Sequence, residues 1–281
     1  MSQESLCAWI DGVGFLAPGL PDWPTARAVL RGEETYRAAP SLLPVASLLP
    51  PAERRRASRV VRLALALGLE AAAAAGAVEA ANLGDLATVF AASGADGHNC
   101  HALCEQLATA DRRISPTRFH NSVHNAAAGY WGIATRSMAP CQVLCAFDAS
   151  FGAGLLDALA QVLVDRRPTL LIAYDSEYPE PLHSKRPIPD CAGVALLLVP
   201  ARTPRSLARI TLYPTQQAAT TLPDAMLEGL RTTIPALRSL PLLQLLARRE
   251  SGSERDANGG SDSVCLDYLP PSQLGVDVEA C

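Results

Sequence analysis

Residues 115–159 read SPTRFHNSVHNAAAGYWGIATRSMAPCQVLCAFDASFGAGLLDAL. An Asn-Ala-Ala-Ala-Gly run in this stretch opens a helix, and a short apolar strand then leads through small residues into a second helix. A nucleophile at such a strand-to-helix elbow is exposed to substrate and feels the positive end of the helix dipole, which lowers the pKa of a thiol. The elbow, residues 147–152, reads FDASFG and contains no cysteine.

Two side chains at this degenerate elbow, Asp148 and Ser150 on either side of Ala149, are candidates for reaction with a substrate. A carboxylate or a hydroxyl can form an acyl intermediate when a base activates it, and His124 is the candidate base of such an acyl transferase or hydrolase. The simpler interpretation, which we prefer, is that Asp148 caps the following helix and Ser150 packs or caps beside it. The Gly-x-Ser-x-Gly motif of serine hydrolases is absent. Cys145, in the apolar run VLCAF, is expected to be a small buried hydrophobic residue.

The composition is that of a folded protein without a nucleic-acid partner. The chain has 281 residues, is 49% hydrophobic and carries a formal net charge of −4, so it has an ample core and no basic surface for nucleic acid. Its longest apolar runs, such as 192–199, are far shorter than a membrane span. The first residues lack the basic and apolar regions of a secretory signal, so we expect a cytoplasmic protein with no membrane span.

The eight cysteines are expected to be thiols, because they are scattered through a chain too large to need disulfides. The one dense cluster of metal-binding residue types is His98-Asn99-Cys100-His101-Ala102-Leu103-Cys104. A closed zinc site needs four ligands, and no second Cys or His pair stands nearby to complete one. His101 and Cys104 also have ordinary helical spacing. We therefore expect neither a metal nor a cofactor.

Strands and helices alternate along most of the chain. The expected elements are a strand (8–15), a turn and short helix (16–34), a Pro-rich loop (39–51), a long helix (52–81), buried strands (86–93 and 168–174), and a pair of strands (191–199 and 208–213) joined by the turn ARTPRS. This alternation predicts an α/β domain with helices on the faces of a sheet. A helical segment over 223–249 completes the predicted domain, 1–249.

The last part of the chain has a different composition. The run ESGSERDANGGSDS, 250–263, is polar and rich in small residues, and we expect a flexible segment there. Residues 264–281 are expected to form a C-terminal tail.

The stretch 118–132, RFHNSVHNAAAGYWG, resembles the ketoacyl synthases, and the order of elements is similar to theirs over 7–214. Within that family the chain resembles chain-length-factor-like proteins found beside aryl polyene or xanthomonadin-type polyketide synthases. The resemblance implies a thiolase-like α/β fold, the N-terminal half of a ketoacyl synthase, with helices layered on a central mixed sheet. Ketoacyl synthases carry the acyl-accepting cysteine at this elbow. They hold the thioester carbonyl with two histidines, or a histidine and an asparagine, from the second half of the fold, and here no histidine follows His183.

The resemblance therefore implies a non-catalytic subunit that pairs with an active ketoacyl synthase and meets the acyl carrier protein, if at all, through that complex. Residues near the subunit interface and acyl tunnel would be Phe119, His120, His124, Asn125, Tyr130 and Trp131. Tyr130 and Trp131 are equally compatible with core packing, since aromatic side chains dominate both settings. His120 and His124, four apart on an expected helix, suit hydrogen bonds at a subunit contact better than a metal site.

Overall fold

The computed structural model describes residues 6–77, 83–94, 96–249 and 263–281. Its centre is a single eight-stranded sheet in the order β3-β2-β4-β5-β1-β6-β8-β7. β2 runs parallel to β3 and β4, whereas every other neighbouring pair is antiparallel, so the sheet is mixed, as predicted. The strands are β1 (Leu6–Leu16), β2 (Ala87–Ala91), β3 (Cys141–Leu144), β4 (Thr169–Asp175), β5 (Ala192–Val199), β6 (Ala208–Thr215), β7 (Ser263–Leu266) and β8 (Gln273–Ala280).

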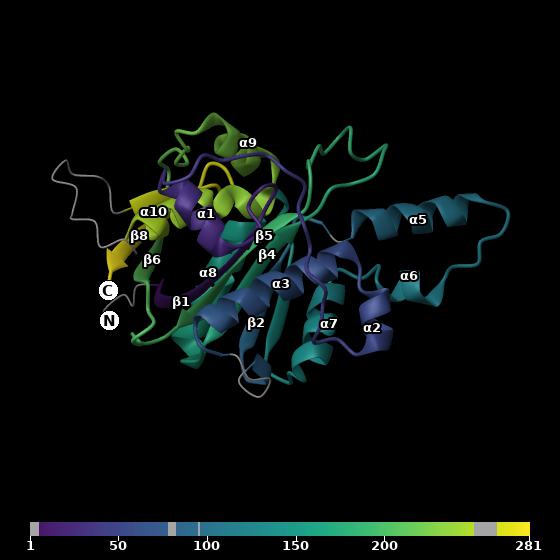
Figure 1. Ribbon diagram of the computed structural model, residues 1–281, viewed down its shortest axis with the longest axis horizontal. Coiled ribbons are helices and arrows are strands. Elements are labelled where there is room, and N and C mark those ends of the chain that lie inside the picture. Colours follow the sequence, from purple (N-terminus) through teal and green to yellow (C-terminus); the bar gives the residue numbers. More distant parts are fainter. Residues whose placement is uncertain (1–5, 78–82, 95, 250–262) are drawn as a thin grey trace.

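Helices cover both faces of the sheet (Figure 1). One face carries α3 (Arg59–Ala74) and α7 (Ala126–Thr135), and the other carries α1 (Trp23–Leu30), α8 (Ser150–Asp165) and α10 (Leu240–Arg249). Shorter helical elements are α2 (Pro51–Arg56), α9 (Ala225–Thr233) and the 3-10 turns η1 (Phe147–Ala149) and η2 (Pro235–Ser239).

Strand β4 shows why the central strands read as continuous apolar runs. Leu170 and Ile172 point into the core beneath α3 and α7, while Leu171 and Ala173 point into the core beneath α8. All seven residues of β4 are buried. A strand with helices on both faces has no solvent side, so it shows no polar alternation.

The expected pairing of 191–199 with 208–213 is wrong, because β1 lies between β5 and β6 and pairs antiparallel with both. The turn between β5 and β6 therefore has to cross the width of a strand. The hydroxyls of Thr203 and Ser206 donate to the Asp11 carboxylate at 2.7 and 2.6 Å, which holds this connection against β1.

The expected long helix over 52–81 is divided into α2 and α3 at Ala57, whose backbone is extended. The division lets Arg54 in α2 donate to the carbonyl oxygens of Ser47 and Leu49, at 2.8 and 2.9 Å. α3 ends at Ala74, before the expected end, and residues 78–81 lie outside the described residues.

The C-terminal residues 264–281, expected as a tail, hold most of β7 and all of β8, and β8 pairs with β6 along its whole length. Val276 and Val278 of β8 are buried in the same core as α8 and α10. Of the expected flexible segment 250–263, only Ser263 is described, and it begins β7.

One segment of the described residues, Phe147–Asp165, is long and apolar enough to cross a membrane. Half of its most apolar window is buried, and the α8 part packs on β2 and β4. Burial against the sheet is a sufficient reason for its composition.

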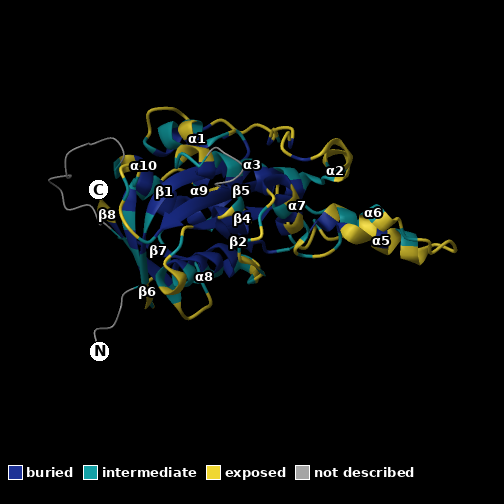
Figure 2. Ribbon diagram, turned by 90° about the horizontal axis from the view of Figure 1, so that it is seen from below, coloured by how far each residue is buried: buried dark blue, intermediate teal, exposed yellow. Residues whose placement is uncertain are grey.

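An arm formed by α5 (Gly97–Ala108) and α6 (Pro116–His120) extends from the body at the right of Figure 1. Most of its surface is exposed or intermediate in Figure 2. The expected helical spacing of His101 and Cys104 is confirmed, because both lie on α5.

Candidate functional site

The predicted elbow is present, and its backbone is strained at Phe147. This residue follows strand β3 and has φ = 52°, in the left-handed region that costs a side-chain-bearing residue roughly 1–2 kcal/mol. Its ring is 61% exposed. The elbow therefore displays a phenyl ring, which has no nucleophilic atom, where this geometry displays a reactive side chain in an enzyme.

An arginine from the loop between β4 and β5 closes over this ring. The guanidinium of Arg186 lies 3.9 Å from the centre of the Phe147 ring, a cation–π contact, and donates to Asp148 at 2.8 Å. Arg238 of η2 donates to the other oxygen of Asp148 at 3.1 Å. The expectation that Asp148 caps α8 is wrong, since the N-cap is Ala149 and no side chain bonds to the first turn. Asp148 instead neutralises two arginines.

The same ion network continues to the C-terminal strands. Arg238 also pairs with Asp267 at 3.1 Å, and Asp267 pairs with Arg231, whose side chain is only 7% exposed. Arg231 in turn pairs with Glu228 at 2.6 Å. The backbone around Asp267 also lies over the first turn of α8. The C-terminal part of the chain is therefore tied to the elbow by both charge and contact.

Ser150 is not positioned to attack a substrate. It is 1% exposed, its hydroxyl donates to the Phe147 carbonyl at 2.7 Å, and its oxygen accepts from the Ala146 N–H at 3.1 Å. The candidate base His124 is not among its hydrogen-bond partners, and the Nε2 atom of His124 is buried without one. The expectation that Ser150 packs beside the helix start agrees with this arrangement.

Cys145 is exposed, so the expectation of a buried residue is wrong. Strand β3 ends at Leu144 and is the edge of the sheet, which leaves the following residue without a covering layer. The Cys145 thiol donates to the Ser93 carbonyl oxygen at 3.3 Å.

A buried carboxyl lies next to the elbow, at the end of β4. Asp175 accepts hydrogen bonds from the Ser93 backbone N–H at 2.9 Å, from the Ser93 hydroxyl and from the Ala236 N–H at 2.8 Å. Burial raises the pKa of Asp175 to about 6, although these hydrogen bonds act in the opposite direction. The Tyr178 side chain interacts with Ser93 and Arg186, which places it between Asp175 and the elbow arginine. Such a perturbed carboxyl is common in active sites.

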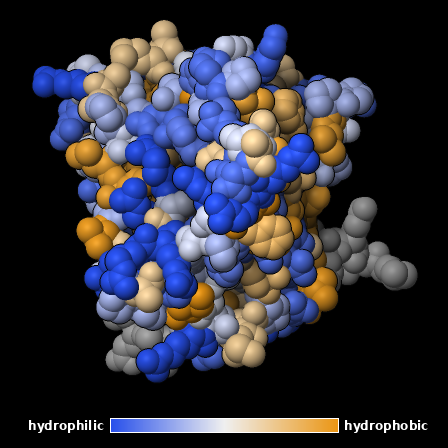
Figure 3. All heavy atoms as spheres, turned by 90° about the vertical axis from the view of Figure 1, so that its right-hand side faces the viewer, coloured by the Kyte–Doolittle hydropathy of each residue, from blue (hydrophilic) through white to orange (hydrophobic). Residues whose placement is uncertain are grey.

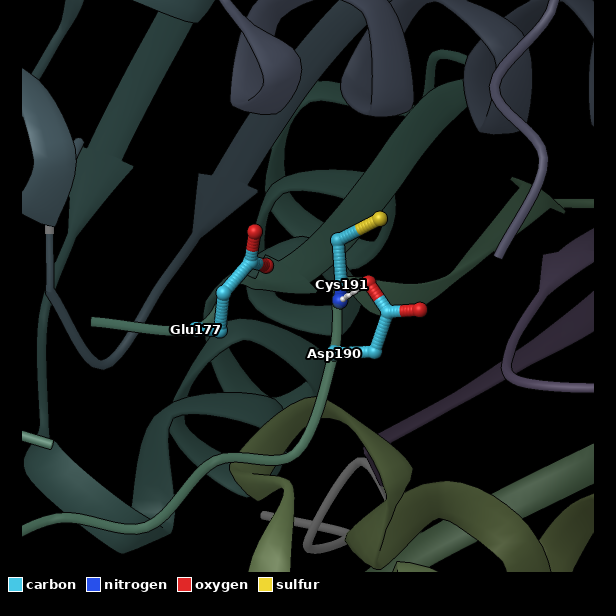
Figure 4. Close-up of side chains that lie close together, drawn as sticks. All are labelled: Glu177, Asp190 and Cys191. Carbon is cyan, nitrogen blue, oxygen red and sulfur yellow. Dashed lines mark hydrogen bonds between the residues drawn. The ribbon is translucent and has the colours of Figure 1, made fainter. Parts of the chain in front are cut away.

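A second cluster, on the other side of β4, contains Glu177, Asp190 and Cys191, whose ligand atoms lie within 4.8 Å of one another (Figure 4). Arg59 already neutralises it, with contacts of 3.1 Å to Glu177, 2.7 Å to Asp190 and 3.2 Å to the Cys191 sulfur. Burial raises the pKa of Cys191 to about 11, which disfavours the thiolate that binds metals. The cluster is better suited to holding Arg59 than a metal ion.

The residues of the 98–104 cluster are engaged separately. His98 lies 3.5 Å from Glu177, and His101 lies 3.2 Å from Glu105 on the same helix.

The six predicted interface residues differ in burial, with His124 intermediate between the buried and the exposed ones. Tyr130 and Trp131 of α7 are buried in the core, where Trp131 packs edge-on against Phe90. Phe119 is 65% exposed on α6, and His120 and Asn125 are exposed as well. His120 ends α6 and His124 lies in the turn before α7, so the expectation that the two histidines share a helix is wrong.

The end of the molecule that carries the arm shows hydrophobic side chains among hydrophilic ones (Figure 3).

Three residues that close the elbow, Arg186, Arg238 and Tyr178, were not predicted from the sequence. Arg186 and Arg238 lie 38 and 90 residues from Asp148 in the chain, so no local spacing relates them. One signal in the sequence could have indicated this region: the polar run that begins with Asp175 at the end of a buried strand. The ends of parallel strands bring side chains together at one edge of a sheet.

A family model described as "Beta-ketoacyl synthase, N-terminal domain" matches residues 28–254. No curated protein matches the sequence.

Several solved structures share the fold. The chain is similar to the ketosynthase ApeO in complex with its chain length factor ApeC from Xenorhabdus doucetiae, at 20% identity and a TM-score of 0.67, over 96% of this chain and 98% of that one. It is similar to the ishigamide ketosynthase/chain length factor at 16% identity and a TM-score of 0.68, over 97% and 99%. The third is AntDE:AntF, a type II polyketide synthase acyl-carrier protein in complex with its ketosynthase, at 10% identity and a TM-score of 0.70, over 99% and 100%.

Proposed function

The chain belongs to the family of β-ketoacyl synthase N-terminal domains, and from that membership we propose that it is a non-catalytic, chain-length-factor-like subunit. It pairs with an active ketoacyl synthase as a heterodimer in the cytoplasm and shapes the acyl tunnel. The pathway class is polyene or fatty-acid-type biosynthesis, with aryl polyenes the favoured product. The carrier protein reaches it through the complex.

The elbow carries this proposal. Its strained backbone is retained, but the side chain displayed there is Phe147, under Arg186. A phenyl ring cannot accept an acyl group, so the elbow supports a pseudoenzyme. No observation favours the alternative acyl transferase or hydrolase, because the Ser150 hydroxyl is buried in local hydrogen bonds and Asp148 is paired with two arginines.

The edge of the sheet supports a protein partner. Thr88 and Ala92 of the β2 region donate to the carbonyl oxygens of residues 140 and 144. Backbone direction alternates along a strand, so residues 141 and 143 turn their N–H and C=O groups outward. In the described part of the chain no strand lies beyond β3. An open edge of this kind is a template for pairing with another chain. Two of the similar structures are complexes of a ketosynthase with a chain length factor.

Among the aromatic residues predicted near the tunnel, Phe119 is the one with an exposed ring, and we propose that it limits the tunnel. Phe119→Ala should change the stability by less than about 0.5 kcal/mol, because surface substitutions rarely do more, and should lengthen the product of the complex. Trp131→Ala should instead cost about 3–5 kcal/mol of stability by leaving a core cavity. Urea unfolding and product mass spectrometry separate the two outcomes. Longer products from a stable Trp131→Ala protein, with none from Phe119→Ala, would contradict this assignment.

The test of the function is co-expression with the ketoacyl synthase encoded nearest to this chain, followed by size-exclusion chromatography with mass determination. We expect a stable 1:1 complex, and a lone chain that aggregates or forms homodimers. Condensing activity should require the catalytic cysteine of the synthase and survive Ser150→Ala and Asp148→Asn here. A monodisperse chain that ignores the synthase, or activity lost with Ser150, would overturn the proposal.

A further inference from the structure

The ion and hydrogen-bond network at the elbow does not serve chemistry in the proposed function, yet it is extensive. We propose that it anchors the arm: Tyr178, held by Arg186, is a positioning residue that fixes the direction in which α5 and α6 leave the body. The part of this inference that concerns the partner rests on the proposed function, because the arm carries Phe119.

The arm has little structural support of its own. Only two of the 12 residues of α5, Gly97 and Leu103, are buried, and none of α6 is. A helix of about 12 residues is marginal in water without packing. Within the arm, Asn99 donates to the Arg118 carbonyl at 2.8 Å, which joins the two helices to each other but not to the body. The direction of the arm must therefore be set where it joins the body.

At the first junction, the Tyr178 ring lies against two glycines that flank the start of α5. A Cβ atom on Gly94 would lie 2.0 Å from the Tyr178 hydroxyl oxygen, and one on Gly97 would lie 2.1 Å from its ring. Only glycine lets the backbone approach the ring this closely. The ring is also packed on the core beneath α8. The Tyr178 ring thus packs between the body and the first turn of the arm.

The side chain of Tyr178 also links this packing contact to the elbow. It interacts with Ser93 and Arg186, both of which lower the pKa that burial raises. The Ser93 hydroxyl also donates to Asp175, so the same serine lies between Tyr178 and the buried carboxyl. Arg186 is itself held by the Phe147 ring and by Asp148. These two contacts hold Arg186 beside the Tyr178 side chain, and the ring itself is fixed by its packing against Gly94 and Gly97.

The remaining contact at this junction is weaker, and the second junction is independent. His98 lies 3.5 Å from Glu177 with half of its side chain exposed, and ion pairs of this kind contribute little. At the other end of the arm, Asn121 donates to the Arg56 carbonyl at 2.9 Å and accepts from the Tyr130 hydroxyl at 3.1 Å. Substitutions at Tyr178 should therefore loosen α5 more than α7.

Hydrogen exchange of the lone chain, followed by mass spectrometry, tests the anchor without any partner. In Tyr178→Ala, the amides of α5 should exchange about tenfold faster or more, because local opening becomes easier. Tyr178→Phe and Arg186→Ala should give smaller increases in the same segment. The matched control is Tyr213→Ala, which removes a half-exposed tyrosine from β6 and should leave α5 unchanged. Unchanged exchange of α5 in all three variants, with β4 and β5 still protected, overturns the proposal.

A second measurement covers the case in which Tyr178→Ala destabilises the whole fold, which would appear as faster exchange in β4 and β5. Tyr178→Phe keeps the ring and Arg186→Lys keeps the charge. Faster exchange of α5 in these two variants then supports the anchor, and unchanged exchange of α5 overturns it. In the complex, Tyr178→Ala should weaken synthase binding about tenfold, and equal affinity with a loosened arm overturns the partner part of the inference. A wild-type chain that binds no synthase refutes the proposed function, whereas the exchange rates of α5 in the lone chain still test the anchor independently.

Discussion

At the elbow, a strained backbone displays a phenyl ring in place of a nucleophilic side chain. Phe147 retains the positive φ of a strained turn, and Arg186 stacks on it at 3.9 Å. Strain of this kind persists only where surrounding contacts over-determine the conformation. The contacts of Asp148 with Arg186 and Arg238 supply that restraint. At the residue scale, the strained turn is therefore held in place by an ion network.

Asp175 should make the stability of the protein depend on pH. Burial raises its pKa to about 6 in the folded state, above the ordinary value of 3.8, so folding favours its protonated form. This contribution is fully present below the unfolded-state pKa and is lost as the pH rises through the folded-state pKa. Between about pH 5 and about pH 7.5, the free energy of unfolding should fall by about 1 kcal/mol from this group.

Urea unfolding of the wild type and of Asp175→Asn at the two pH values checks this expectation. The difference in unfolding free energy between the two proteins should change by about 1 kcal/mol across the range, because the amide does not titrate. Parallel pH dependences of the two proteins would show that Asp175 does not titrate in this interval.

At the scale of elements, the sequence predicted most strands and helices correctly, because their signals are local. The apolar run that forms β4 and the Asn-Ala-Ala-Ala-Gly start of α7 both follow from periodicity and composition. The division of the helix at Ala57 and the exposure of Cys145 did not follow. The exposure of Cys145 depends on a tertiary feature, the edge position of β3, whereas the break at Ala57 is accompanied by bonds from Arg54 to carbonyls five and seven residues away.

The open edge of β3 gives a prediction at this scale. Val143→Pro removes an outward N–H group while leaving the β2 side of the strand intact, and proline is tolerated at such edge positions. The variant should fold normally and bind the synthase about fivefold to tenfold more weakly, as expected for one lost hydrogen bond. Binding is measured by titration of the purified synthase, and folding by thermal unfolding.

The neighbouring residue supplies the control for that variant. Gln142→Pro removes an N–H on the β2 side, so it should lower the melting temperature of the lone chain as well as binding. If Val143→Pro binds the synthase as tightly as wild type, the β3 edge does not pair with the partner.

For the whole molecule, the features that the sequence could not predict are contacts between distant segments. β1 lies between β5 and β6, although these two strands follow each other in the chain. The C-terminal residues were expected as a tail because the polar run before them suggested the end of the domain. Instead β8 covers the edge of β6, and Asp267 completes the ion network at the elbow. Long-range pairing leaves no local pattern, whereas the α/β class was visible from the alternation of elements.

The role of the C-terminal strands leads to a prediction for a chain that ends at Arg249. Its loss of β7 and β8 would expose the edge of β6 and leave Arg231, a nearly buried cation, without Asp267. Removing one member of a buried ion pair alone typically costs about 3–5 kcal/mol, so the shortened chain should be insoluble or melt without a cooperative transition. The matched control replaces 250–262 by the same number of Gly and Ser residues and keeps both strands. It should melt like the wild type in circular dichroism, and a soluble truncated chain with the wild-type melting temperature would show that 1–249 folds as an independent domain.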